Sequence, residues 1–201
     1  MPSRLKQSCG HCDTHVQNRN VGAAQAGQAE KQGGETVGNL HGRIGGVVDG
    51  SDIHCEIAGG NIRGRFGGDV LGKDVVLSFD GRKLSGRYGG LIDGKDINAE
   101  IAGNRLFGRI GGLIGGADID LFVAGDRVRG RVGGPIVGFD CDVIWGEDGT
   151  LGGRFGGALI GHDFSGEFHD IEPLLAVAIA AIVYYQDRLE HSHHSSQSGH
   201  S

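Results

Sequence analysis

The stretch Phe107–Gly134, FGRIGGLIGGADIDLFVAGDRVRGRVGG, contains the phrase G-R-x-G-G twice, 22 residues apart. The same phrase begins at Gly42, Gly64, Gly86, Gly108, Gly130 and Gly153. Six copies at a nearly constant interval indicate a repeat architecture, in which each copy is one supersecondary unit. The sixth unit is one residue longer, and its extra residue falls in the turn-like segment GEDGT, Gly146–Thr150.

Each repeat has two halves, and both alternate large or small apolar residues with polar ones. The first half resembles RLFGRIGGLI, Arg105–Ile114, and the second half resembles ADIDLFVAG, Ala117–Gly125. Dipeptides such as GN, GD and DG stand at the joints, and they are typical of β-hairpin turns. Each unit is therefore predicted to be one β-hairpin, and six units predict twelve strands.

Alternation along a strand assigns the residues to two faces. One face of the first-half strand carries Leu106, Gly108, Ile110, Gly112 and Ile114. The other face carries the arginine, which predicts one apolar and one polar face of the sheet. We expect the apolar face to point inward, with Gly108 and Gly112 making room for another element. The alternative, apolar outside as in a transmembrane barrel, is disfavoured by short strands and missing aromatic girdles.

The polar face is predicted to form a ladder of alternating charge. A turn at Gly103–Asn104 places Asn98 opposite Arg109, and Arg109 is then diagonal to both Asp96 and Glu100. The ladder consists of Arg43, Arg65, Arg87, Arg109, Arg131, Arg154, Asp52, Asp74, Asp96, Asp118, Asp140 and Asp163. Exposed ion pairs each contribute about 0.2–1 kcal/mol, so the ladder is interpreted as structural.

The charge pattern also favours one topology over others. A parallel solenoid would stack arginine on arginine and aspartate on aspartate, whereas an antiparallel meander interleaves the two charges. An even number of strands lets the first and last strands pair, which removes both edges of the sheet. An open sheet covered by a helix and a two-sheet sandwich are the alternatives to this closed barrel.

The apolar run LLAVAIAAIVYY, Leu174–Tyr185, follows Pro173 and has no polar face. Such a segment is typical of a fully buried helix, and it is short for a bilayer span. A barrel of twelve strands is too wide to be filled by its own side chains. The predicted fold is therefore mainly β: six tandem 22-residue hairpins form an antiparallel meander, closed into a barrel around or covered by this helix.

The chain divides into four segments by composition. Residues 1–34 are polar and aperiodic, which predicts a flexible N-terminal tail. Residues 35–170 form the six-repeat β domain, and residues 171–190 form the apolar helix packed in the barrel. Residues 191–201, HSHHSSQSGHS, are a His/Ser-rich tail.

Composition limits the classes of partner. The net charge of −6 argues against a nucleic-acid binder, which usually carries a basic patch. Residues 1–34 contain no apolar signal segment, which favours a cytoplasmic location and free thiols. The partner is unknown: membrane association is an alternative that is not favoured, and self-association through exposed apolar residues such as Leu91, Leu113 and Phe122 stays open.

Two tail motifs suggest metal binding. The segment SCGHCDTH offers Cys9, His11, Cys12 and His15, in which C-x-x-C is a zinc or redox half-site. The C-terminal tail offers His191, His193 and His194, which bind transition metals loosely when exposed. No cofactor is predicted apart from zinc at these termini, and unstructured tails with incidental donors are the alternative interpretation.

No catalytic cluster stands out in the sequence. Paired carboxylates recur in every repeat, whereas a catalytic pair should be singular, and Cys55 and Cys141 occupy apolar-face positions typical of core thiols. We therefore expect a non-enzymatic structural or interaction protein of unknown ligand. One alternative is a membrane-active protein that releases its helix or rearranges into a pore. The other is a metal-binding protein that uses its Cys/His-rich termini.

Overall fold

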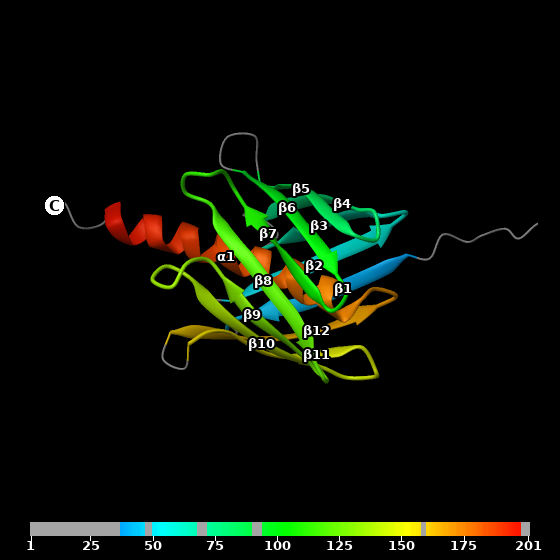
Figure 1. Cartoon of the computed structure of the whole chain (residues 1–201). Helices are drawn as coiled ribbons and strands as arrows, with labels where there is room; N and C mark the ends of the chain where they lie inside the picture. The colour runs from blue at the N-terminus through cyan, green and yellow to red at the C-terminus, as the bar shows by residue number, and fades with distance from the viewer. Residues whose placement is uncertain (1–36, 47–49, 68–71, 90–93, 158–159, 198–201) are drawn as a thin grey trace, which may run out of the picture. The chain divides into compact units, whose positions relative to one another are not determined.

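The computed structural model describes residues 37–46, 50–67, 72–89, 94–157 and 160–197, with the backbone alone over 190–197. The predicted N-terminal tail, 1–34, lies outside these residues. Twelve strands and one helix make up the described chain (Figure 1). The strands are β1 (Gly38–Ile44), β2 (Ser51–Ala58), β3 (Asn61–Phe66), β4 (Lys73–Phe79), β5 (Lys83–Tyr88), β6 (Lys95–Ala102), β7 (Arg105–Ile110), β8 (Ala117–Ala124), β9 (Arg127–Val132), β10 (Phe139–Trp145), β11 (Thr150–Gly156) and β12 (Gly161–His169).

All twelve strands form one closed antiparallel barrel, as the repeat pattern predicts. Each strand pairs with its neighbour in the chain, and β1 pairs with β12 to close the ring. The predicted register is confirmed at β6 and β7, where Asn98 lies opposite Arg109. Leu106 and Ile110 are buried, so the apolar face of the sheet points inward.

The barrel encloses the N-terminal half of the helix α1 (Pro173–Gln197), and the C-terminal turns of α1 extend beyond the strands (Figure 1). All twelve residues of Leu174–Tyr185 are at most 8% exposed. The helix contacts β1 and β2 on one side of the ring and β7 to β10 on the other. A helix buried on every side within a closed ring of strands fills the interior that the strands leave open. Of the helices that the structure describes, none combines the length and apolarity needed to cross a bilayer.

The helix is longer than predicted and continues to Gln197 instead of ending near residue 190. Residues 186–197 contain no glycine or proline, so nothing in this segment stops a helix that is anchored by its buried body. The predicted metal ligands His191, His193 and His194 therefore lie on the last turns of α1.

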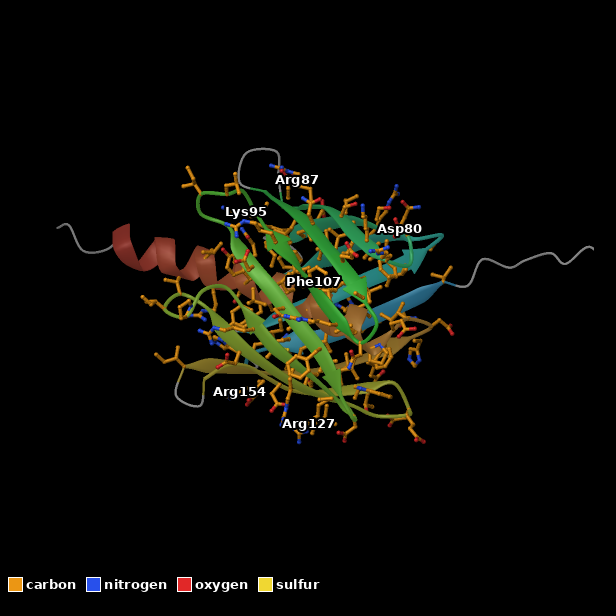
Figure 2. The ribbon with its side chains drawn as sticks, in the orientation of Figure 1. Asp80, Arg87, Lys95, Phe107, Arg127 and Arg154 are labelled. Atoms are coloured by element: carbon orange, nitrogen blue, oxygen red, sulfur yellow. The ribbon has the colours of Figure 1, made fainter. Side chains whose placement is uncertain are left out.

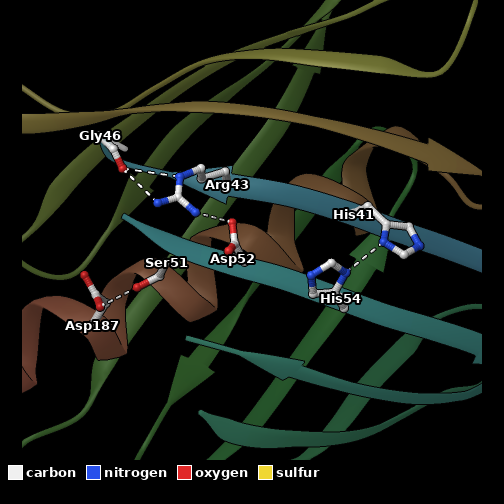
Figure 3. Close-up of polar contacts among 7 residues, drawn as sticks. All are labelled: His41, Arg43, Gly46, Ser51, Asp52, His54 and Asp187. Carbon is white, nitrogen blue, oxygen red and sulfur yellow. Dashed lines mark hydrogen bonds and ion pairs between the residues drawn. The ribbon is translucent and has the colours of Figure 1, made fainter. Parts of the chain in front are cut away.

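The two ends of the barrel are connected by different segments. At one end, the turn end, strands are joined by residues 59–60, 80–82, 103–104, 125–126 and 146–149. At the other, the loop end, they are joined by residues 45–50, 67–72, 89–94, 111–116, 133–138 and 157–160. The helix starts at the turn end, where Leu174 adjoins Phe79 and Ile101. It leaves through the loop end, where Asp187 accepts a hydrogen bond from Ser51 at 3.0 Å (Figure 3).

The predicted role of the glycines in the G-R-x-G-G phrase is wrong in two respects. Strand β7 ends at Ile110, because Gly111 has a φ of +84° and turns the chain out of the strand, so Gly112 lies in a loop. A Cβ at Gly108 would lie 2.3 Å from the Cα of Ala99 on β6. Gly108 is therefore required by the close approach of the adjacent strand, and not by the helix.

Candidate functional site

The repeated arginines lie near the strand ends that lead into the loop end. Figure 2 labels two of them, Arg87 and Arg154. Each repeated arginine pairs with the aspartate nine residues later, which lies directly opposite it on the next strand, as in Arg109 and Asp118. The six pairs are Arg43–Asp52, Arg65–Asp74, Arg87–Asp96, Arg109–Asp118, Arg131–Asp140 and Arg154–Asp163. Each arginine of the ladder is thus paired with an aspartate on the strand that follows its loop. Glu100, one of the predicted diagonal neighbours of Arg109, pairs with Arg82 instead.

The same guanidinium groups also hold the loops. Arg109 donates from Nε to the Gly112 carbonyl and from Nη2 to the Leu113 carbonyl, both at 3.1 Å. Carbonyls of the adjacent loop also accept hydrogen bonds from Arg43, Arg87, Arg131 and Arg154. We call this arrangement, one guanidinium between a carboxylate and loop carbonyls, the arginine clamp. It explains the repeated phrase: the arginine fixes the loop that the following glycines allow to curl.

The loops held by these clamps expose aliphatic side chains. Leu113 and Ile114 are 92% and 98% exposed, and Ile136 is 93% exposed. Together with Val137 and Ile160 these residues form what we call the apolar rim. In sequence, every loop of the loop end carries two adjacent aliphatic residues: Val47–Val48, Val70–Leu71, Leu91–Ile92, Leu113–Ile114, Ile136–Val137 and Leu159–Ile160.

The turn end carries polar groups instead. Asp80 accepts hydrogen bonds from the backbone N–H groups of Lys83 and Arg82 at 2.7 and 2.9 Å, and these bonds lower the pKa of its carboxyl. Asp148 accepts from the hydroxyl and the backbone N–H of Thr150, which lowers its pKa in the same way. In Figure 2, Asp80 lies toward the end opposite that of Arg87. The turns are thus closed by short-range polar contacts.

Aromatic residues fix the helix where it leaves the barrel. The ring of Tyr184 packs edge-on against Phe139, with centroids 4.6 Å apart, and stacks on Phe155 at 5.4 Å. Its hydroxyl lies 3.2 Å from Nδ1 of His162, and burial raises its pKa. The Arg188 guanidinium lies over the Phe139 ring at 5.9 Å. The exit of α1 is therefore a packed part of the loop end.

The two cysteines within the barrel are core residues, as predicted. Cys55 and Cys141 are free thiols and almost fully buried. Burial raises the pKa of Cys55 to about 12 and also raises the pKa of Cys141. Both thiols are therefore protonated near neutral pH, and they are unreactive because the thiolate is the reactive form.

One polar contact on the outer wall is absent from the predictions made from the sequence. Nδ1 of His41 lies 2.9 Å from Nδ1 of His54 on the adjacent strand (Figure 3). The sequence does contain a signal for this contact, because the strand register that pairs Arg43 with Asp52 also places His41 opposite His54. That register becomes visible only when the loop 45–50 is recognised as a loop.

The predicted terminal metal ligands are not brought together by the described part of the structure. Cys9, His11, Cys12 and His15 lie outside it, and so do the side chains of His191, His193 and His194. Within the described residues, no group of three or more His, Cys, Asp or Glu side chains is arranged to hold a metal ion. Zinc binding at the termini stays a prediction.

Comparison of the chain with protein-family models, with curated proteins and with solved structures gives no match.

Proposed function

We propose that the protein is a non-enzymatic structural protein that assembles with further copies of itself through the apolar rim. The observation that carries the proposal is the exposure of Leu113, Ile114 and Ile136, each more than nine-tenths open to solvent. Large contiguous apolar patches are rare on soluble monomers and mark sites of contact. Exposed aliphatic side chains on three described loops of one end supply apolar surface of this kind.

The rest of the barrel supports this choice of surface. A closed barrel has no strand edge, so pairing of one sheet with another is not open to it. At the loop end each arginine has an aspartate beside it, so identical rims do not repel one another through unpaired arginines. The loops carry the most exposed aliphatic side chains of the described surface, and the clamps give them a defined backbone conformation.

A second copy fits the rim better than a flat bilayer does. The helix leaves the barrel through the loop end and continues from Gln186 to Gln197, a length of about 18 Å. This segment, QDRLEHSHHSSQ, is polar, and charged residues enter hydrocarbon at high cost. A bilayer that contacted all the loops would have to accept this polar helix, whereas a protein surface can pack beside it.

The groove beside the emerging helix offers a receiving surface for a loop of another copy. It is lined by Val137, Phe139, Tyr185, Arg188 and Leu189. The loop tips and the groove lie at the same end of the barrel and share Val137, so they can meet reciprocally between two copies or in series along a ring or filament. The proposal therefore accommodates a dimer as well as larger assemblies.

The non-enzymatic part of the proposal rests on repetition. The charged pairs of the wall recur in each repeat, and a catalytic constellation requires one singular arrangement. The buried thiols Cys55 and Cys141 have raised pKa values, which suits packing and not nucleophilic attack.

Sedimentation velocity over a range of protein concentrations tests the proposal. The full chain is expected to show species larger than a monomer that grow with concentration. Combined replacement of Leu113, Ile114, Ile136, Val137 and Ile160 by Ser is expected to leave a monomer. The matched control replaces exposed apolar residues of the barrel wall, Val76, Phe107, Phe122 and Ile144, by Ser.

The control is expected to assemble as the wild type does. A wild-type chain that stays monomeric at every concentration would overturn the proposal. So would a monomer that binds phosphatidylcholine vesicles and loses that binding when the rim is replaced, because the rim would then contact lipid.

A further inference from the structure

The contact between His41 and His54 joins two adjacent strands on the outer wall of the barrel. His41 lies on β1 and His54 directly opposite on β2. Their Nδ1 atoms are 2.9 Å apart, and the rings meet edge-on with an interplanar angle of 73°. Both side chains are exposed, so solutes can reach the two nitrogen atoms (Figure 3).

This pair occurs in one of the six repeats. The same cross-strand position holds Arg63–Val76, Ser85–Asn98, Phe107–Asp120, Arg129–Asp142 and Gly152–Ser165 in the others. None of these five pairs places two metal-ligating side chains opposite each other. The first repeat therefore departs from the pattern at both strands of one position, and it does so with the residue type that most often binds transition metals.

The spacing of the nitrogens suits a shared metal ion. Metal–imidazole bonds are about 2.0–2.1 Å long, so two of them at a right angle place their nitrogens about 2.9 Å apart. A tetrahedral angle would instead separate them by about 3.3 Å. Right angles between ligands are typical of square-planar or octahedral Cu²⁺ and Ni²⁺, whereas Zn²⁺ prefers a tetrahedron. Without the ion, the two Nδ1 atoms share one hydrogen bond, in which one ring donates and the other accepts. Once that proton has moved to Nε2 of the donor ring, small rotations of the rings would direct both lone pairs at one ion.

We propose that His41 and His54 form a binding site for a divalent first-row transition metal, with Cu²⁺ held more tightly than Ni²⁺. Each imidazole would bind through Nδ1 and carry its proton on Nε2, and water would complete the coordination. Glu167 lies opposite His41 on β12 and adds negative charge beside the ion. On the far side Arg65 lies opposite His54, but its charge is offset by Asp74, 3.3 Å away.

The ion would link β1 to β2 beside the place where the barrel closes. The strand β1 pairs with β2 on one side and with β12 on the other. A ligand that binds the folded barrel alone stabilises it by mass action. This site needs neither the apolar rim nor the terminal Cys and His residues. Its test is therefore independent of the test of the proposed assembly.

The experiment uses a full-length chain whose terminal donors are removed. This tail-silent variant replaces Cys9, His11, Cys12, His15, His191, His193, His194 and His200 by Ser. Calorimetric titration with Ni²⁺ at neutral pH is expected to show one ion per chain, and Cu²⁺ is expected to bind more tightly. The electron paramagnetic resonance spectrum of bound Cu²⁺ should show hyperfine coupling to two nitrogens.

Two further variants make the test specific. Adding His41→Asn or His54→Asn to the tail-silent variant should weaken Ni²⁺ binding by about tenfold or more, because one of two protein ligands is lost. Circular dichroism should stay unchanged, since both side chains are exposed. Adding Ser85→His together with Asn98→His rebuilds the pair at the equivalent position of the third repeat, and a second Ni²⁺ ion is expected.

Three results would overturn the inference. The first is a tail-silent variant that binds no Ni²⁺. The second is a His41→Asn substitution that leaves the Ni²⁺ affinity of the tail-silent variant unchanged. A Ser85→His, Asn98→His variant that folds but takes up no second ion would contradict the argument from cross-strand geometry.

Discussion

The turn end and the loop end of the barrel are reached by the same twelve strands, yet they are closed in different ways. At the turn end, two to four residues reverse the chain, and Asp80 and Asp148 accept hydrogen bonds from neighbours in sequence. At the loop end, connections of four to six residues are held by arginines, and Leu113 and Ile114 point into solvent. Polar groups therefore close one end, whereas at the other they support an apolar surface.

The difference shows what the arginine does in each repeat. A short turn needs no support from a distant side chain, because its own backbone and side-chain contacts satisfy its polar groups. A longer glycine-rich loop with aliphatic tips gains nothing by collapsing into the core, which α1 already fills. The clamp gives such a loop fixed partners for its carbonyls.

The two ends should depend on one shared core, because α1 runs between them. Ile182 is 1% exposed inside the barrel. Ile182→Asp places a charge there and should lower the free energy of unfolding by several kcal/mol. Urea unfolding followed by the fluorescence of the single tryptophan, Trp145, measures this change. Ile182→Val, the control, should lower it by about 0.5–1.5 kcal/mol; an aspartate variant as stable as the valine variant would refute an internal helix.

On β11, which joins the two ends, an added methyl group should be tolerated at Gly152 but not at Gly153. A Cβ at Gly153 would lie 2.3 Å from the Asp142 carbonyl oxygen, whereas a Cβ at Gly152 would meet nothing within 4 Å. Gly153→Ala should therefore destabilise the barrel by about 1–3 kcal/mol, an overpacking effect, and Gly152→Ala should be close to neutral. Thermal unfolding compares the two. Equal midpoints would mean that the adjacent strand does not approach as closely as the structure shows.

The clamp should act locally at the loop end. Arg109→Met removes the bonds to Asp118, Gly112 and Leu113, so amides of the loop 111–116 should exchange with deuterium about tenfold faster. The free energy of global unfolding should fall by about 1 kcal/mol or less, because the ion pair is exposed. Arg105→Met, which removes an ion pair with Asp120 without loop carbonyls, is the control and should leave that loop's exchange unchanged. Equal deuterium exchange of this loop in the two variants would show that Arg109 does not hold the loop.

The smallest effect should appear at the turn end on acidification. Hydrogen bonds from Lys83 and Arg82 lower the folded-state pKa of Asp80 below its unfolded value. The resulting stabilisation is complete above the unfolded pKa, which is about 3.9, and is lost as the pH falls through the folded pKa. Asp80→Asn should therefore reduce the decline in stability between about pH 5 and pH 2. Urea midpoints measured over this range check the sign, and a steeper decline in the variant would contradict it.

Much of the fold could be predicted because the repeat and the alternation of apolar residues point to the same answer. The interleaved charges favour an antiparallel meander, and the even strand number favours closure. The helix body could be located because Leu174–Tyr185 is apolar on every side. Its extension to Gln197 could not, since polar residues of ordinary helix propensity do not mark an end.

The site was harder to predict, because the loops continue the strand pattern. Residues up to Ile114 keep the alternation of β7, although Gly111 turns the chain out of the sheet. Alternation alone cannot detect a glycine with positive φ. For this reason the alternation assigns Ile114 to the inward face, although it is 98% exposed, and reveals neither the loop partners of Arg109 nor the approach of His41 to His54.

The direction of α1 through the barrel decides which end the helix shares with the apolar rim. Nuclear Overhauser effects from the ring of Tyr184 measure this direction. We expect cross-peaks to the rings of Phe139 and Phe155, whose centroids lie 4.6 and 5.4 Å from that of Tyr184. Cross-peaks from Tyr184 to Phe79 at the turn end, with none to Phe139 or Phe155, would contradict it.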